Sequence, residues 1–475
     1  MTKNVVIVGG GYTGTCAAIQ VSRHAQLPVN ISVVEKRDNV GQGVAYSATD
    51  PDHRLNAPDM AHFVTPEDQN ALRHWFNEQG GSVFDAAADP GDDVLFIRRR
   101  DFGKFLAEQY ANHQFKNPSG SKIAHIRDTV FDIERSDIGY RLRLDQHKTL
   151  NADLVIVATN NERPATPAPL QPVADHPSFL GDPWDGTTMD SLLKSARLLL
   201  VGTSLTSADV IVSRLRQGHT GPITALSRRG LRSTRRAITP GTYAIPFWER
   251  ITTETSIFVN KHGPQRRVIG LLRSLRDDIR EAEANGLPWQ APFDDLRDSV
   301  WEIWPGLPLE EKRRFMRHLR IWYDIHRYRL PPQLERPIDY AVASGQLRYL
   351  TAHLDNSQPD GKAIAVSYRQ GQIVKTASFD AVINCTGPDP RPDHTDNPFL
   401  KALVSRGLAR PSPVGIGFDV DDDCALVGDC GDRDPRLRVF GPLTLGQFGD
   451  PQGTPFILRH ICRTMPQIVS FLEQV

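Results

Sequence analysis

The sequence lacks the features that define several protein classes. Its 475 residues contain only five cysteines, and no Cys-x-x-Cys pair occurs among them. A disulfide framework, a dithiol redox pair and a zinc half-site are therefore not expected. No run of about 18 apolar residues occurs, so no membrane-spanning helix is predicted. Since the N-terminus also has no basic stretch followed by a cleavage site, we expect reduced thiols and a cytoplasmic location.

An excess of one charge is also missing. Lysine plus arginine equals aspartate plus glutamate at 56 each, which gives a formal net charge of zero. Without a global field, we expect neither nucleic acid nor an anionic membrane as a partner. No His-Glu-x-x-His motif or carboxylate-histidine cluster indicates a metal. What the chain does have is length, because 475 residues exceed one ordinary domain and predict two or three cores.

The first 35 residues predict a strand, a glycine turn, a helix and a second strand. The apolar run Asn4–Val8 is typical of a strand buried on both faces. The turn Gly9-x-Gly11-x-x-Gly14 follows, in which glycines permit a tight turn, close backbone approach to a pyrophosphate, and close packing of helix on strand. Glu35 ends the next strand 21 residues after Gly14, where a carboxylate can accept hydrogen bonds from the hydroxyls of a ribose. Because a second such unit follows this N-terminal one, the pattern favours FAD.

A second strand-turn-helix begins near residue 197. Its turn, from Gly202 to Ser207, repeats the first layout with Ser204 and Ser207 in place of two glycines. No acid ends the following strand, where Arg228 and Arg229 stand instead. An arginine at this position accommodates a 2′-phosphate, so the pattern favours NADPH over NADH. Two alternatives stay open: the arginines could be solvated surface charges, or the serines could mark a turn that has lost its nucleotide.

These motifs resemble those of the bacterial FAD/NAD(P)-binding proteins, a group that includes an FAD-dependent urate hydroxylase. The resemblance runs through nearly the whole chain. It includes the blocks Gly41-Gln42-Gly43-Val44-Ala45-Tyr46, Leu55-Asn56, Phe96 to Leu106 with Arg99, Ser227 to Leu231, Arg317 to Pro332, Cys385-Thr386-Gly387-Pro388 and Gly441-Pro442-Leu443-Thr444-x-Gly446. The chain departs from the group at Asn160, at Ser204 and around Asp450 to Leu458. These departures concern the flavin-ring environment and the substrate, and leave FAD binding largely untouched.

The resemblance implies an α/β flavoprotein with two dinucleotide-binding domains, in a glutathione-reductase-type layout with a helical insertion. Residues 1–160 and 381–475 would form the FAD domain, and 195–380 an NAD(P)H domain with the insertion at about 240–335. Glycine turns and resemblance together give the following residues expected to contact FAD or NADPH: Gly9, Gly11, Tyr12, Thr13, Gly14, Glu35, Lys36, Gly43, Arg99, Val130, Gly202, Ser204, Thr206, Arg228, Arg229, Gly387, Asp429, Gly441 and Gly446. Asp429 could bind a ribityl hydroxyl or simply cap a loop.

The resemblance also implies a reaction. NADPH would reduce FAD, and the reduced flavin would use molecular oxygen to hydroxylate a small nitrogen-containing or planar molecule. Two other functions stay open: an NADPH oxidoreductase without oxygen insertion, and a flavin-binding module that no longer turns over. Asn160, Ser204 and Ser207 favour the module, and the missing Cys-x-x-Cys argues against a disulfide reductase.

The segment from Arg313 to Arg329 is the best candidate for a substrate-facing surface. On one helix its three- and four-residue spacing would give a shared face made of Arg313, Arg317, Arg320, Asp324 and Arg327. Such a face could bind an anionic or planar substrate or the phosphates of NADPH, and could equally be a solvated surface. The catalytic residues are not determined, and the candidates are Arg320, Asp324 and His326. His326 by itself is more typical of a hydrogen-bonded core histidine.

Overall fold

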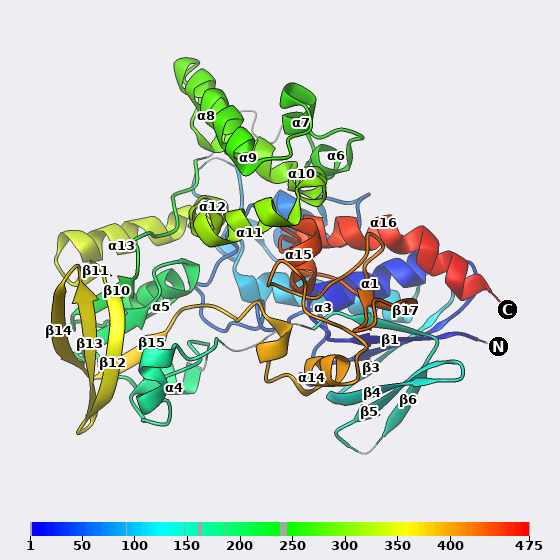
Figure 1. Ribbon diagram of the computed structural model, residues 1–475, viewed down its shortest axis with the longest axis horizontal. Helices are drawn as coiled ribbons and strands as arrows, with labels where there is room; N and C mark the ends of the chain where they lie inside the picture. Colours follow the sequence, from blue (N-terminus) through cyan, green and yellow to red (C-terminus); the bar gives the residue numbers. More distant parts are fainter. Residues whose placement is uncertain are drawn as a thin grey trace.

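The computed structural model describes residues 2–91, 93–146, 148–159, 164–184, 186–237 and 245–474. Two sheets lie side by side, each containing one glycine turn, and a block of helices covers the region above the first sheet (Figure 1). This arrangement is the α/β architecture with two nucleotide-binding units and a helical region that the sequence predicts. Asn160 lies outside the described residues.

The first sheet has six strands in the order β16-β17-β7-β1-β2-β3. They are β1 (Asn4–Val8), β2 (Asn30–Val34), β3 (Lys122–Ile126), β7 (Leu154–Val157), β16 (Ala425–Val427) and β17 (Arg433–Val439). Five of these strands run parallel, whereas β16 pairs antiparallel with β17. The carboxyl ends of β1, β7 and β17 therefore meet at one edge, where the first glycine turn begins.

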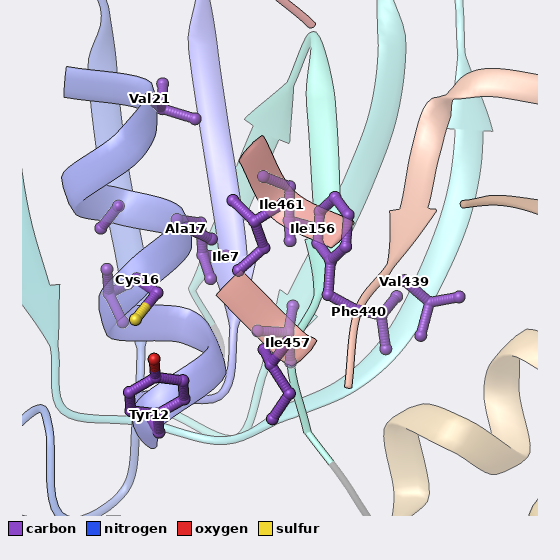
Figure 2. Close-up of a cluster of buried hydrophobic side chains, with 14 of the residues drawn as sticks. Ile7, Tyr12, Cys16, Ala17, Val21, Ile156, Val439, Phe440, Ile457 and Ile461 are labelled. Carbon is purple, nitrogen blue, oxygen red and sulfur yellow. The ribbon is translucent and has the colours of Figure 1, made fainter. Parts of the chain in front are cut away.

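Segments from both ends of the chain share the core of this unit. α1 (Tyr12–His24) and α16 (Thr454–Glu473) pack against each other over the sheet. Figure 2 shows Ile7 and Ile156 of the strands meeting Ile461 of α16. Burial of this kind stabilises by roughly 25 cal/mol per Å² of apolar surface. The C-terminal segment thus folds with the N-terminal one.

The remaining elements of the first unit surround the sheet. An antiparallel meander consists of β4 (Val130–Ser136), β5 (Gly139–Leu144) and β6 (Thr149–Ala152). The helices are α2 (Ala71–Glu78), α3 (Arg99–Phe115), α14 (Pro398–Ser405) and α15 (Leu445–Phe448), and the 3-10 turns are η1 (Asp59–Ala61), η2 (Gly81–Val83), η4 (Pro392–His394) and η5 (Pro442–Thr444).

The second sheet has five parallel strands in the order β11-β10-β9-β15-β8. They are β8 (Phe179–Leu180), β9 (Leu198–Val201), β10 (Ile223–Ser227), β11 (Leu347–Thr351) and β15 (Ala381–Asn384). Around it are η3 (Ala168–Val173), α4 (Gly186–Ser191), α5 (Leu205–Arg216), α13 (Pro332–Ala343) and the antiparallel strands β12 (His353–Asp360), β13 (Ala363–Gln370) and β14 (Ile373–Phe379).

Strand pairing corrects two of the predicted boundaries. β15 follows residue 380, yet it pairs with β9 and β8 in the second sheet. β8 precedes residue 195 and belongs to the same sheet. The short apolar strands β15 and β8 are buried because the second sheet continues past β9, in the order β9-β15-β8. The second unit therefore extends past both of its predicted limits.

Between β10 and α13, the described residues from 245 onward form seven helices, which span the predicted insertion. They are α6 (Phe247–Thr252), α7 (Ile257–His262), α8 (Val268–Ala284), α9 (Gln290–Asp298), α10 (Val300–Gly306), α11 (Leu309–His318) and α12 (Arg320–Arg327). Small cores around Phe258 and Trp304 hold them together, and α6 and α10 contact α16 and α15 of the first unit. No helix among the described residues is long and apolar enough to cross a membrane.

The expected single helix from Arg313 to Arg329 is wrong. α11 ends at His318, Leu319 flanks both helices, and α12 begins at Arg320. The change of direction lets Phe315 of α11 and Tyr323 of α12 pack edge to face, 5.7 Å apart. The predicted basic face is therefore divided between two helices.

Candidate active site and nucleotide-binding turns

The first glycine turn is shaped by contacts that only glycine permits. Gly9 has a φ of +106°, and a Cβ there would lie 2.8 Å from the carbonyl oxygen of Ala158. A Cβ on Gly14 would lie 1.9 Å from the carbonyl oxygen of Gly9. Helix α1 therefore begins directly against the ends of β1 and β7, as the pattern predicts.

Gly11 differs from its two neighbours because the protein leaves room beside it. A Cβ on Gly11 would meet only the Cα of Gly43, at an ordinary 3.5 Å. Gly11 is the N-cap of α1, and no side chain caps the helix, so its first amides stay available to an anion. The open cradle fits the pyrophosphate of a dinucleotide, and Gly43 forms its opposite wall.

The residues that follow the turn are fixed by the core. Tyr12 is buried, and its hydroxyl donates to the carbonyl oxygen of Phe63 at 2.6 Å. Because the Tyr12 side chain is already hydrogen-bonded in the core, any contact of Tyr12 with a cofactor would be made by its backbone. Thr13 lies against the other end of the first unit, since a Cβ on Gly441 would come within 3.0 Å of its Oγ1. The structure therefore brings the Gly441 turn to the first glycine turn.

Glu35 organises the turn in addition to any contact with ribose. Its carboxylate is buried and accepts hydrogen bonds from the Gly10 amide at 2.9 Å and from the Arg37 amide at 3.0 Å. Lys36 beside it is exposed and lines a cavity of about 930 Å³ between the loop around His53 and α5. The acid and the turn form one hydrogen-bonded unit.

The second glycine turn reproduces the backbone of the first. Gly202 has a φ of +118°, and a Cβ there would lie 2.3 Å from the carbonyl oxygen of Cys385. Ser204 caps α5 with φ −97° and ψ −158°, close to the −75° and −164° of Gly11. These angles are ordinary for serine. The hydroxyl of buried Ser207 donates to the Ser204 carbonyl at 2.8 Å, which satisfies it inside the turn.

The mouth of this second turn is exposed and basic. Ser204 is exposed, and its hydroxyl lies 2.9 Å from that of Ser233. Thr206 is half-buried in the first turn of α5. Arg228 and Arg229 are exposed directly after β10 ends. Both arginines stand where the sequence places them, at the carboxyl edge of the second sheet.

A smaller cavity of about 320 Å³ lies where the two units meet the helical region. Pro442, next to Gly441, and Pro388, next to Gly387, both line it. Tyr46 and His62 add aromatic walls from the first unit, and Phe456 adds one from α16. Segments that follow β17 in the first sheet and β15 in the second thus meet at one space. This cavity is the candidate active site.

Arginine is the dominant charged residue around this cavity. The described lining contains one aspartate, Asp294, and four arginines: Arg236, Arg250, Arg297 and Arg327. Arg297 donates to Asp294 at 2.8 Å and forms an ion pair with Asp298 at 2.6 Å. Burial alone would raise the pKa of Asp294, but the charges of Arg297 and Arg329 outweigh it and lower the pKa to about 2. The acid is therefore ionised at neutral pH.

His62 is the histidine in the described lining. It is buried, and its Nδ1 lies 2.8 Å from the carbonyl oxygen of Pro58, which assigns the proton to Nδ1. Burial lowers the pKa of His62 to about 4. The ring is therefore neutral at physiological pH and contributes no charge to the cavity.

The three catalytic candidates lie elsewhere. Arg320 donates to the Asp324 carboxylate at 2.7 Å within α12, and neither residue is in the described lining of the 320 Å³ or the 930 Å³ cavity. His326 contacts the Trp322 carbonyl oxygen at 2.6 Å through Nδ1 and packs against Trp289. His326 is thus half-buried and hydrogen-bonded within its own helix. From the predicted face, only Arg327 reaches the candidate active site.

Asp429 lies at the wrong edge of the first sheet for a flavin contact. It follows β16, which runs antiparallel to β17, so it stands opposite the edge that carries the glycine turn. Its amide donates to the Gly407 carbonyl oxygen at 3.1 Å. The alternative interpretation, a loop residue, is the one that the placement supports.

The other predicted contacts have mixed placements. Arg99 forms an ion pair with buried Asp209 of α5 at 2.7 Å, and so connects the two units. Val130 is buried at the start of β4. Gly387 has a φ of +79° with open space around it. Gly446 lies against Ser412, and its carbonyl oxygen accepts from the Trp304 indole at 2.9 Å.

Comparison with known proteins agrees with this geometry. Residues 6–162 match a protein-family model described as FAD-NAD(P)-binding. A relative from Mycobacterium tuberculosis, uncharacterized protein Rv3403c, is 22% identical over 529 residues, covering 100% of this chain and 94% of the relative. Ornithine hydroxylase PvdA from Pseudomonas aeruginosa is similar in structure, with a TM-score of 0.65, 11% identity and full coverage of both chains.

A second solved structure extends the likeness. Kutzneria sp. 744 ornithine N-hydroxylase KtzI, described with reduced FAD, NADP+ and L-ornithine, gives a TM-score of 0.64 at 14% identity over 99% of both chains. At these identities the likeness establishes the fold. The resemblance seen in the sequence is thus confirmed: residues 6–162 match the FAD-NAD(P)-binding model, and the chain shares its fold with flavoproteins that have two dinucleotide-binding domains.

Proposed function

We propose that this protein is an FAD-dependent NADPH monooxygenase that hydroxylates a small metabolite. One observation carries the proposal: the two nucleotide-binding units place the ends of their strands at a single cavity, through Pro442 and Pro388. A flavin and a nicotinamide bound at the two glycine turns would both be directed toward it. The fold shared with ornithine N-hydroxylases supports the same class and favours a nitrogen-containing substrate.

The residues that would hold FAD fit the group. The open space at Gly11 would leave room for the pyrophosphate, and the uncapped amides of α1 would donate hydrogen bonds to it. Glu35 would accept hydrogen bonds from the ribose hydroxyls. At the second turn, Ser204 and the amides of α5 would donate hydrogen bonds to the pyrophosphate of NADPH. Arg228 and Arg229 would lie beside the 2′-phosphate of the same nucleotide. The chemistry that FAD supplies when bound is hydride acceptance and oxygen activation.

The chain itself contributes binding and electrostatics. A substrate that fills this cavity would displace water from the reacting atoms, which suppresses wasteful oxidation. Its buried arginines favour negative charge within the cavity, and neutral His62 adds none. No described cysteine lines the cavity, so a dithiol relay to a disulfide substrate has no residues to act through.

The test is NADPH oxidation by the FAD-loaded protein, with and without a panel of amines that includes ornithine, lysine and cadaverine. Substrate-stimulated oxidation with a hydroxylated product supports the proposal. Substrate-independent transfer of electrons to dyes without product would indicate the reductase. No flavin reduction by NADPH or NADH would indicate the binding module. Colourless protein that stays colourless in excess FAD would reject all three.

A further inference from the structure

The chemistry of Arg327 suggests what the candidate active site binds. Its side chain is 9% exposed, and the partner of its Nε, Asp450, is 3% exposed at 2.6 Å. Its Nη1 and Nη2 groups make no hydrogen bond to any residue that the structure describes. A guanidinium donor that no protein group engages gains free energy when a ligand oxygen accepts from it. Arg327 lines the cavity, so its Nη groups are available to a ligand there.

The surroundings hold this guanidinium in one orientation. Asp450 accepts from Arg327 Nε and also, at 2.8 Å, from the hydroxyl of Tyr323. Tyr328 and Phe456 lie beside the guanidinium at 5.1 and 5.8 Å. A Cβ on Gly453, the N-cap of α16, would lie 2.9 Å from Nη2, so the helix amides, with their partial positive charge, begin at the same wall. The guanidinium is therefore held at Nε by Asp450, while Nη1 and Nη2 are left for a ligand.

The geometry of the cluster favours a planar anion that one guanidinium can bind. Around the cavity the described ion pairs join four arginines to four aspartates, which are Arg250, Arg297, Arg327, Arg329, Asp294, Asp295, Asp298 and Asp450. The paired charges balance, and Arg236 also lines the cavity. A carboxylate has one negative charge and a planar pair of oxygens that matches one guanidinium fork. A phosphate dianion needs more donors than one guanidinium fork provides, whereas Arg297 is already engaged by two aspartates.

We propose that the substrate of this enzyme carries a carboxylate, bound by the Nη groups of Arg327 in an orientation that Asp450 fixes. The proposal rests on the proposed function in placing the substrate at this cavity. Arg327 is then a specificity-determining residue and Asp450 a positioning residue. The remaining arginines of the lining supply the positive field in which the anion is held.

The experiment uses the FAD-loaded protein and two pairs of probes: succinate with succinamide, and benzoate with benzamide. Binding is measured by calorimetry and by the change in flavin absorbance, with inorganic phosphate as a third anion. The wild-type protein should bind a carboxylate more tightly than its amide and more tightly than phosphate. Equal binding within both pairs, or tighter binding of phosphate, would overturn the proposal.

Variants locate the site. Arg327→Gln should weaken carboxylate binding about tenfold or more, Arg327→Lys should weaken it less because the charge remains, and Asp450→Asn should also weaken it. Arg313→Gln is the matched control, since this exposed arginine donates to the Pro413 carbonyl oxygen outside the cavity. Wild-type affinity in Arg327→Gln would refute the assignment. If the glutamine variant does not fold, the lysine variant and the wild-type panel decide the outcome.

Two further results separate Arg327 from other roles. If Arg327→Gln changes the sulfite affinity of the flavin while carboxylate binding is unchanged, the arginine serves the flavin and the proposal fails. If NADPH does not reduce the flavin but the binding of carboxylate probes still requires Arg327, the proposed function fails while the proposed ligand class stands. Binding of the probes needs no turnover, so the two failures are distinguishable.

Discussion

The two glycine turns have the same backbone and opposite surroundings. In the first, Gly11 faces Gly43, and the buried carboxylate of Glu35 accepts from the Gly10 amide. In the second, Ser204 lies exposed at the mouth of the turn and exposed arginines replace the acid. An enclosed turn suits a cofactor that stays bound, and an open one suits a nucleotide that enters and leaves in each cycle. The comparison indicates that surroundings, more than the turn itself, divide the two roles.

The largest expected difference between the turns lies at their last position. Gly14→Ala would force a Cβ to within 1.9 Å of the Gly9 carbonyl oxygen, and should cost about 3 kcal/mol of stability or more. Ser207→Ala removes one hydroxyl hydrogen bond and should cost about 1 kcal/mol. Chemical denaturation of both variants measures the two costs. Similar losses would contradict the view that the turns pack differently.

The middle position separates folding from cofactor binding. Gly11→Ala meets only an ordinary contact, so the protein should fold, yet the new methyl group occupies the pyrophosphate approach. We expect FAD content after purification to fall to a small fraction of wild type, with far-ultraviolet circular dichroism unchanged. The matched change, Ser204→Ala, should leave FAD content intact. Full FAD loading in Gly11→Ala would show that the pyrophosphate of FAD does not bind beside Gly11.

The basic edge of the second turn distinguishes the two nicotinamide nucleotides. Arg228→Glu places a negative charge where the 2′-phosphate is expected, and should lower the preference for NADPH over NADH about tenfold or more. The ratio of kcat/KM for the two nucleotides measures this, with Arg369→Glu, at an exposed site on β13, as the control. An unchanged ratio would assign Arg228 to the solvated surface.

The smallest effect concerns acid stability of the first unit. His62 is neutral when folded, with a pKa of about 4 against about 6.5 when unfolded. The unfolded chain therefore binds the extra proton as pH falls below 6.5, and stability should drop by about 1.4 kcal/mol by pH 5.5. In His62→Asn this part of the slope should disappear. Denaturation curves at pH 7.5 and 5.5 for both proteins provide the check, and an unaltered slope would show that His62 is not responsible.

Much of the fold could be predicted from the sequence because its signals are local. The apolar runs that became β1, β7 and β9, and the glycines that follow them, needed no knowledge of distant residues. The helix pattern failed at Leu319, where packing between Phe315 and Tyr323 turned the chain. The sequence left the role of Asp429 open, because the direction of β16, and so the edge at which Asp429 lies, depends on which strand β16 pairs with.

By itself, then, the sequence determined the two nucleotide-binding units and their glycine turns. Only the tertiary structure decided the candidate active site. Its arginines come from positions 236, 250, 297 and 327, and they meet because seven helices fold back over the first unit. The physical reason is one of range: backbone dihedrals and close contacts of glycine are set within a few residues, whereas a buried charge cluster is defined by the partners that packing brings to it.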